Sequence, residues 1–452
     1  MPRARPMTSS PARFLAAAIA IVAASRCAQY RARPVSAETN AEVLAARTLD
    51  SPAVRELITR QMPEVTWPPE RWTPPMLALA AVALHPDLDV ARAEWDAARA
   101  ALRTASERPN PNANAGLEHQ ATGGNGNPWI VTLSLDVPIE TAGKRGARAA
   151  QARALSAAAA ADVDQEIWKV RVRAERAALD LGASRKLAAL REAETALRAE
   201  IVQMWERRVA AGEAAQAEAV RVRADERASR LLLREEQGRG AEREAALASS
   251  IGIPRAALPP LDLTVAATRT SSDAGRLRAV ALTARPDVLA ALARYDAAEQ
   301  ALRLEVRRQY PDVHVGPGLG WDQGAFRWAL SATAELPLFN RHEGPIAEAE
   351  ARRAAEAARL LAVQSRILGE LEAALANADA ARARLDETER AVTSAGALVA
   401  ATRRQFAAGE IDRLALRNVE LLLTLAEVDR WSAWFDVQRA AVAVEAAVEQ
   451  PS

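Results

Sequence analysis

The chain has 452 residues, of which 50% are hydrophobic, 4% aromatic and 26% charged, and its formal net charge is +1. Alanine supplies much of the apolar content, so the composition favours long, closely packed helices over a core of large side chains. Acids and bases are interspersed, which gives no electrostatic support to nucleic-acid binding. Cys27 is the single cysteine, which excludes an intramolecular disulfide.

Residues 1–27 have the features of a secretory signal. Basic residues precede an apolar run at 14–24, which is too short to span a bilayer as a helix. Cys27 follows this run and resembles the acylation site of bacterial lipoproteins, although Arg26 stands where a small residue is expected. The alternative is cleavage further along the chain, which would discard the cysteine. We therefore expect an exported protein, with lipidation left open and a linker at 28–75 that includes the extended segment WPPERWTPP.

Most of the remaining chain is an internal duplication. The stretch HPDLDVARAEWDAARAALR recurs as RPDVLAALARYDAAEQALR, and RPNPNANAGLE recurs as YPDVHVGPGLG. TLSLDVPIETAGKRGARAA recurs as SATAELPLFNRHEGPIAEA, and an AAGE turn occurs once in each half, at offsets of 197 to 202 residues. This pattern predicts two structural repeats, 76–250 and 276–450, joined by a linker at 251–275.

Each repeat is expected to contain a helix, two strands, a very long helix, a tight turn and a return helix. The long helices are predicted at 144–210 and 343–408, because apolar residues recur there every three to four positions. At 1.5 Å per residue each would be about 100 Å long. The shorter helices are expected at 76–108, 213–250, 276–308 and 411–450. Placed end to end, 213–250 with 276–308 and 411–450 with 76–108, two of them are about as long as one long helix. Both strand pairs are therefore predicted at one end and both turns at the other.

The strands alternate apolar and polar residues, as the strands of transmembrane β-barrels do. The alternation is clear at 129–137 and in its repeat partner, but weaker at 112–120 and 312–321. The residues expected to face lipid are Val131, Leu133, Leu135, Phe326, Trp328 and Leu330. An ordinary half-buried sheet is the alternative, but export and the repeated alternation favour the barrel.

Four strands cannot close into a barrel, and open sheet edges are not tolerated in lipid. Copies of the chain must therefore share one barrel. Two copies would supply eight strands, which side chains would fill, whereas three would supply twelve and leave room for a channel.

Three groups of motifs carry a family resemblance: the HPDL and RPDV helix starts, the strands that lead into DVPIE and ELPLF, and the AAGE turns. These features are those by which the chain resembles the TolC family of outer-membrane efflux factors, and the resemblance covers roughly residues 76–444. The resemblance implies a mainly α fold with a small β part: a homotrimer with a 12-stranded barrel in outer-membrane lipid, continued by a long helical periplasmic tunnel. It also implies a periplasmic adaptor and an inner-membrane RND-type pump as partners. PIETAGKRGAR and LPLFNRHEGPI resemble the CzcC-like branch, which implies passive export of heavy-metal cations.

The AAGE turns form the candidate channel entrance. Gly212 and Gly409 are expected to be left-handed at a tight helix reversal. The entrance residues are Gly212, Glu213, Glu218, Gly409, Glu410 and Asp412. In one interpretation the acids only favour helix N-termini; in the other, threefold symmetry turns them into rings that favour cations. By resemblance, Glu218 matches a gate position of the family, whereas its counterpart is Ala415, and Asn418 stands where another acid is often found.

No catalytic pattern is present. The four histidines are far apart, and the sequence lacks HxH, HExxH and CxxC motifs. We therefore predict no enzyme activity, no metal site and no cofactor. The alternative to a channel is an exported structural coiled-coil protein whose strands form a small head domain.

Overall fold

The computed structural model describes residues 30–121, 128–264, 273–322 and 324–448. It divides into two units, 1–46 and 47–452, and each is described by itself. The described part of the first unit contains α2 (Ala37–Ala45), whose N-cap Ser36 accepts a hydrogen bond from the N–H of Thr39 at 3.3 Å. The expected signal segment, including Cys27, lies outside the described residues.

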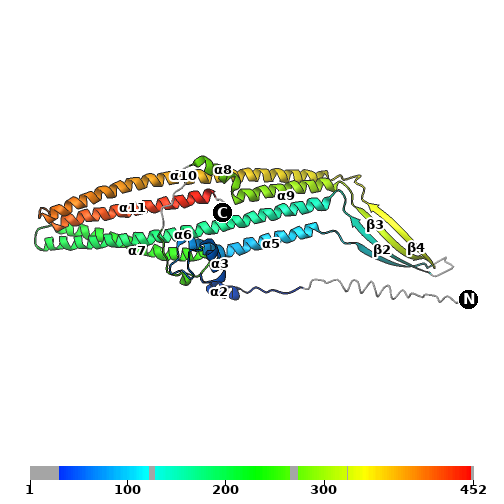
Figure 1. Ribbon diagram of the computed structural model, residues 1–452, viewed down its shortest axis with the longest axis horizontal. Helices are drawn as coiled ribbons and strands as arrows, with labels where there is room; N and C mark the ends of the chain where they lie inside the picture. Colours follow the sequence, from blue (N-terminus) through cyan, green and yellow to red (C-terminus); the bar gives the residue numbers. More distant parts are fainter. Residues whose placement is uncertain (1–29, 122–127, 265–272, 323, 449–452) are drawn as a thin grey trace. The chain divides into compact units, whose positions relative to one another are not determined.

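The second unit begins with α3 (Pro52–Gln61) and then repeats one order of elements twice (Figure 1). The first repeat consists of α4 (Pro74–Leu84), α5 (Pro86–Ser106), β1 (Asn112–His119), β2 (Trp129–Ile139), α6 (Lys144–Ala210) and α7 (Gln216–Ile251). After the short 3-10 helix η1 (Arg255–Ala257), the second consists of α8 (Ala274–Ala284), α9 (Pro286–Arg308), β3 (Val313–Asp322), β4 (Ala325–Ala334), α10 (Glu343–Ala407) and α11 (Arg413–Val448). The mainly α fold with a small β part is confirmed.

The prediction of single helices at 76–108 and 276–308 is wrong, because each is divided in two by one extended residue. These residues are His85 (φ −69°, ψ 127°) and Arg285 (φ −63°, ψ 142°). Each precedes a proline, whose ring disfavours the helical conformation of the residue before it. The prolines then occupy the first turn of α5 and α9, where a missing N–H is tolerated. The return helices begin at Gln216 and Arg413, slightly later than predicted.

The segment expected as an extended linker, 28–75, is folded in part. Helix α3 buries Val54 and Ile58 against the first repeat. Trp72 is only 5% exposed, and its backbone N–H and C=O form 3.0 Å hydrogen bonds with the residues on either side of Leu261. The chain before the first repeat is therefore paired with the chain that joins the two repeats. The proline-rich composition conceals the few apolar side chains that fix this packing.

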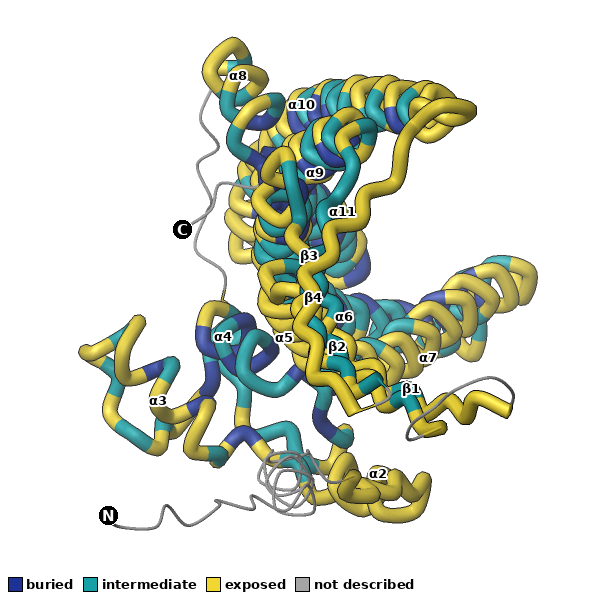
Figure 2. Tube along the Cα trace, turned by 90° about the vertical axis from the view of Figure 1, so that its right-hand side faces the viewer, coloured by how far each residue is buried: buried dark blue, intermediate teal, exposed yellow. Residues whose placement is uncertain are grey.

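The four strands form one antiparallel sheet in the order β1-β2-β3-β4. Directly opposite residues share a face, and one such row runs Leu117, Val131, Trp321, Phe326. The apolar residues of β2 and β4 therefore lie on one common face, as their alternation predicts. Strand β4 is exposed over its whole length (Figure 2).

The long helices pack side by side as a single curved layer. Near the sheet the neighbours are α5–α6–α9–α10, and near the turns they are α7–α6–α11–α10. Helix α10 therefore occupies one edge throughout, on the same side as β4. Helices α5 and α7 occupy the other edge, on the same side as β1. Among the described residues, no contact of comparable extent joins α10 to α5 or α7.

Two hydrophobic clusters hold the middle of the layer, one for each repeat. Their members occupy equivalent positions: Leu77, Ala81, Leu88 and Leu247 in the first, and Leu277, Ala281, Val288 and Val444 in the second. Each cluster joins the helix break to the end of a return helix and to one long helix. The duplication seen in the sequence is thus repeated in the packing.

Candidate functional site

The α6–α7 and α10–α11 turns have the same backbone geometry. Gly212 has φ +77° and Gly409 has φ +76°, so both adopt the left-handed conformation that the sequence predicts. At each turn the N–H of the following glutamate donates to the carbonyl five residues back, at 2.9 Å for Glu213 and 3.0 Å for Glu410. This is the Schellman arrangement, which satisfies carbonyls at the helix end. The turns lie at the end of the helical layer opposite the sheet (Figure 1).

The side chain of Asp412 makes two polar contacts among the described residues, and they connect the two turns. One carboxylate oxygen accepts a hydrogen bond from the N–H of Ala415 at 2.7 Å and so caps α11. The other pairs with Arg208, near the end of α6. The capping interpretation therefore describes Asp412 well. Its charge is also partly offset by a cation that the sequence analysis did not consider.

The other candidate acids are held less tightly. Glu218 pairs with Arg221 within α7, with a 3.2 Å separation of Nη2 and Oε2. Glu213 and Glu410 are exposed, and neither forms an ion pair within the described part of the chain. The structure thus brings all four acids to the same end of the layer and leaves two of their charges without an arginine.

Next to each turn, a further ion pair links the two helices of the hairpin, and we call this pair the staple of that hairpin. In the first repeat, Arg223 of α7 pairs with Glu206 of α6 at 2.6 Å. In the second, Arg403 of α10 pairs with Glu420 of α11 at 2.8 Å. Both positions are shifted by 197 residues, so these are equivalent pairs with their charges exchanged. The sequence analysis missed them, although a comparison of the repeats for opposite charge at equivalent positions would have found them.

Glu420 is the centre of the second staple. It also accepts from Arg417 at 2.5 Å, and Arg417 contacts Glu200 of α6 at 2.9 Å. Burial disfavours ionisation of Glu420, but the two arginines outweigh that effect and hold its pKa below the usual 4.5. The turn region is therefore a network of fixed charges and not a set of independent carboxylates.

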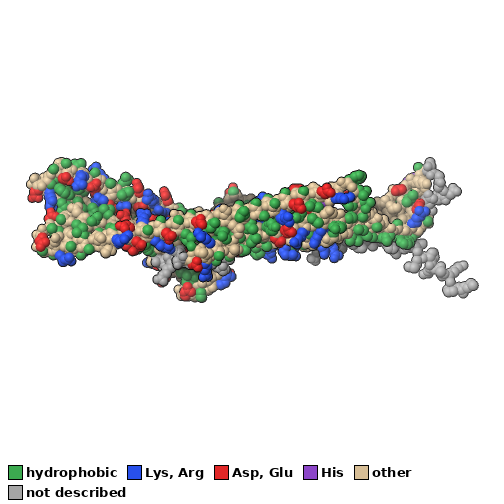
Figure 3. Space-filling view, turned by 90° about the horizontal axis from the view of Figure 1, so that it is seen from above, with side chains coloured by type: hydrophobic (Ala, Val, Ile, Leu, Met, Phe, Trp, Pro, Cys, Tyr) green, Lys and Arg blue, Asp and Glu red, His purple; other side chains and the backbone are tan. Residues whose placement is uncertain are grey.

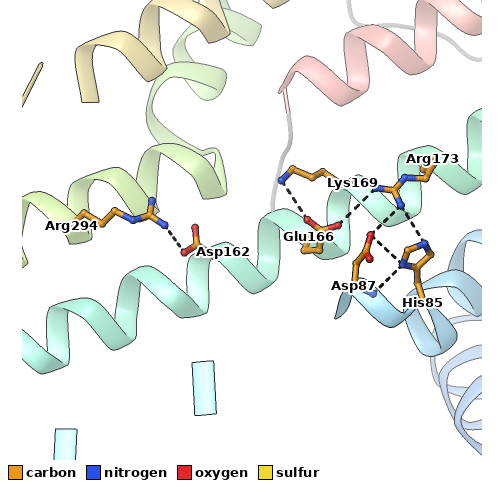
Figure 4. A network of polar contacts seen from close by, with 7 residues as sticks. All are labelled: His85, Asp87, Asp162, Glu166, Lys169, Arg173 and Arg294. Carbon is orange, nitrogen blue, oxygen red and sulfur yellow. Dashed lines mark hydrogen bonds and ion pairs between the residues drawn. The ribbon is translucent and has the colours of Figure 1, made fainter. Parts of the chain in front are cut away.

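A second polar network lies at the helix break of the first repeat (Figure 4). His85 is 7% exposed, and its Nε2 lies 3.2 Å from Nη1 of Arg173, which also contacts Asp87 at 3.3 Å. A guanidinium only donates, and the N–H of Asp87 donates to Nδ1 at 3.3 Å, so both contacts disfavour the protonated, charged ring. Burial lowers the pKa of His85 below its usual 6.5; Asp87 opposes this shift and Arg173 reinforces it.

The second repeat has a permanent charge at the equivalent place. Arg285 is 2% exposed and donates to both carboxylate oxygens of Asp287, at 3.1 and 2.9 Å. It also donates to the carbonyl of Ala447 at 2.7 Å, and Arg366 of α10 contacts the same carboxylate at 3.0 Å. The polar contacts at the helix break therefore differ between the repeats: the first has a buried histidine, and the second has a buried arginine paired with an aspartate.

The helical surface mixes charges of both signs, as Figure 3 shows for the face that it draws. None of the described helices is long and apolar enough to cross a membrane. Among the described residues, no three His, Cys, Asp or Glu side chains are grouped as a metal site would require.

Two long helical hairpins joined end-on to a small, exposed sheet define a transport-channel architecture. The chain belongs to the outer membrane efflux protein family, whose model matches residues 77–253 and 277–449. It is therefore an efflux channel of the outer membrane with a periplasmic helical tunnel, and not an enzyme. This membership contradicts the alternative of a structural coiled-coil protein without a channel.

Solved structures have the same fold. The outer membrane protein VceC of Vibrio cholerae is 22% identical with a TM-score of 0.67, over 83% of this chain and 95% of that one. CusC is 15% identical with a TM-score of 0.68, over 83% and 91%. The outer-membrane channel OprN is 20% identical with a TM-score of 0.66, over 93% and 98%. No curated protein sequence matches the chain.

Proposed function

We propose that three copies of this chain form a 12-stranded transmembrane barrel continued by a helical tunnel. The observation that carries this proposal is the pair of free edges, β4 with α10 on one side and β1 with α5 and α7 on the other. A free sheet edge in lipid would leave backbone groups without partners, each at a cost of several kcal/mol. Pairing of β4 with β1 of the next copy removes both edges.

In this assembly the common apolar face of the sheet contacts lipid. It includes the six predicted residues, Val131, Leu133, Leu135, Phe326, Trp328 and Leu330, all of which are exposed in the single chain. Trp328 is the most exposed of them, at 77%. Burial of such side chains in hydrocarbon is favourable, whereas the opposite face carries the polar residues expected of a channel lining.

The internal repeat predicts the register between copies. Within one chain, Leu133 of β2 lies opposite Leu319 of β3. The repeats align Leu133 with Ala332 and Leu319 with Leu117. We therefore expect Ala332 to lie opposite Leu117 of the next copy.

The test is disulfide cross-linking in a Cys27→Ser background. Ala332→Cys combined with Leu117→Cys should give a covalent trimer on denaturing gels after oxidation. The control combines Ser331→Cys with Leu117→Cys, which places the two thiols on opposite faces and should cross-link poorly. A monomer from the first pair, or equal yields from both, would contradict the shared barrel.

We assign the channel to the CzcC-like branch, with heavy-metal cations as cargo delivered by an RND-type inner-membrane pump and a periplasmic adaptor. Two exposed acids at the turns of each chain, Glu213 and Glu410, support a preference for cations, together with Glu218 and Asp412. The left-handed turns at Gly212 and Gly409 would form the periplasmic end that meets the adaptor.

Planar-bilayer recordings test the cation preference. Asp412→Asn with Glu218→Gln removes two charges but keeps an oxygen that can cap α11 at Ala415. The double variant should lower the cation-to-anion permeability ratio without loss of the trimer. An unchanged ratio would mean that these residues only cap and pair.

We also retain lipidation of Cys27 as a proposal that follows from its place after the apolar run. Labelling with a radioactive fatty acid should be abolished by Cys27→Ser, with the trimer retained because the barrel alone anchors it. Absence of label on the unmodified chain would decide against acylation.

A further inference from the structure

A groove of about 670 Å³ lies at mid-height of the helical layer, between α6, α7 and the end of α11. Val170, Ala174 and Ala178 of α6 pack into the cluster shared with α3, α4 and α7. The groove is lined instead by Val172, Arg176 and Asp180, each two positions further along. Two positions rotate a helix by about 200°, so these three residues lie on the side of α6 that faces away from that cluster.

The groove has an excess of positive charge. Its charged lining residues are Lys169, Arg173, Arg176, Asp180 and Arg243. Lys169 and Arg173 are held by acidic partners (Figure 4), and Asp180 accepts from Arg439 at 2.7 Å. Arg176 and Arg243 have no acidic partner within the described residues. Two guanidiniums without an acidic partner among the described residues, an exposed one from α6 and a partly buried one from α7, therefore line one groove.

Two polar atoms of the groove are also buried without an acceptor among the described residues. They are Nη1 of Arg243 and the indole Nε1 of Trp168. A buried donor that lacks an acceptor is destabilising, and more so when it is charged. Both atoms require an acceptor, and the guanidinium requires a negative one to offset its charge.

We propose that this groove binds an organic anion, in which a carboxylate, sulfonate or phosphate group pairs with Arg176 and Arg243. One valine, three alanines and two serines line the rest of the groove beside the ring of Trp168, and the apolar side chains would cover an apolar body. A water molecule can satisfy the indole N–H but carries no charge for the arginines. Because one chain forms the whole groove, the site does not depend on the proposed trimer or on its cargo.

The probe is naphthalene-2-sulfonate, titrated into the full-length protein in a neutral detergent and followed by calorimetry. Its neutral analogue, naphthalene-2-methanol, has the same apolar body. The sulfonate should bind at one site per chain and at least about tenfold more tightly than the alcohol, since hydrogen bonds to charged groups are the stronger ones. Added salt should weaken binding of the sulfonate and leave binding of the alcohol unchanged.

Arg176→Gln and Arg243→Gln should each reduce sulfonate affinity about tenfold, and Arg243→Lys should reduce it less because the charge remains. The matched control is Arg239→Gln, one turn from Arg243 on α7, whose side chain pairs with Glu236 at 2.6 Å. The Arg239→Gln variant should bind the sulfonate with the same affinity as the unmodified protein. Equal affinity for the two probes, or full sulfonate affinity in the Arg176→Gln, Arg243→Gln double variant, would overturn the proposal.

Discussion

Alanine at the two turn glycines should weaken both turns by the same amount. Apart from each glycine and its two chain neighbours, no described atom lies within 4 Å of the position where a Cβ would stand at Gly212 or Gly409. The penalty is therefore the left-handed backbone alone, about 1–2 kcal/mol, reduced by about 0.4–1 kcal/mol because alanine also restricts the unfolded chain. The net loss is about 1 kcal/mol at each turn. Gly252 is different, because a Cβ there would lie 3.1 Å from the carbonyl oxygen of Leu84.

Hydrogen exchange read by mass spectrometry measures this loss where it occurs. The N–H groups of Glu213 and Glu410 close the two turns, and a loss of about 1 kcal/mol lowers their protection about fivefold. Gly212→Ala and Gly409→Ala should agree with each other, whereas Gly252→Ala should lose considerably more protection around its own helix end. Unequal effects at the two turns, or a turn variant as damaging as Gly252→Ala, would refute the reasoning.

Three further changes test the sheet, the buried histidine and the turn staple. Leu330→Arg should cost about 2–4 kcal/mol near the bilayer midplane and deplete the heat-labile trimer on gels, whereas Ser331→Arg should be tolerated; equal tolerance would count against the barrel. The folded pKa of His85 is below 6.5, so the unfolded chain protonates first and stability should fall as pH drops from about 6.5 toward the folded pKa. His85→Gln should make the melting temperature less dependent on pH in this range. An unchanged dependence would mean that another group causes it. Arg403→Gln and Glu420→Gln should each destabilise the second hairpin, and a thermal double-mutant cycle should give a coupling of about 0.2–1 kcal/mol; strict additivity would mean that the pair is not coupled.

The sequence predicted the elements that have a strong period and a matched copy. Both long helices, the strand pairs and the left-handed glycines follow from repetition and alternation, which act locally along the chain. The division of the two opening helices was also predictable, because His85 and Arg285 stand before prolines. The amphipathic pattern continues across each break and conceals it.

Other features depend on distances that no local pattern encodes. Trp72 meets the chain around Leu261 only because the chain that includes α3 folds back on the first repeat. The pairing of Arg208 with Asp412 joins residues that are 204 positions apart. In a chain with 59 basic and 58 acidic residues, composition alone does not select one partner from many. The candidate entrance residues do lie at the two turns, where repetition in the sequence places them, while their arginine partners are found only in three dimensions.

The two edges of the helical layer differ from each other, and this difference limits the ways in which copies of the chain can assemble. A pair related by a twofold axis places each surface against its own equivalent, so an edge that fits only its opposite stays unused. Head-to-tail addition is the remaining route, and it either closes as a ring or continues as a filament. If successive copies in the proposed ring are related as the two repeats of one chain are, the angle between α6 and α9 sets the turn made at every step. A substitution that flattens this angle would leave each copy folded, but would widen the bore or leave the ring open.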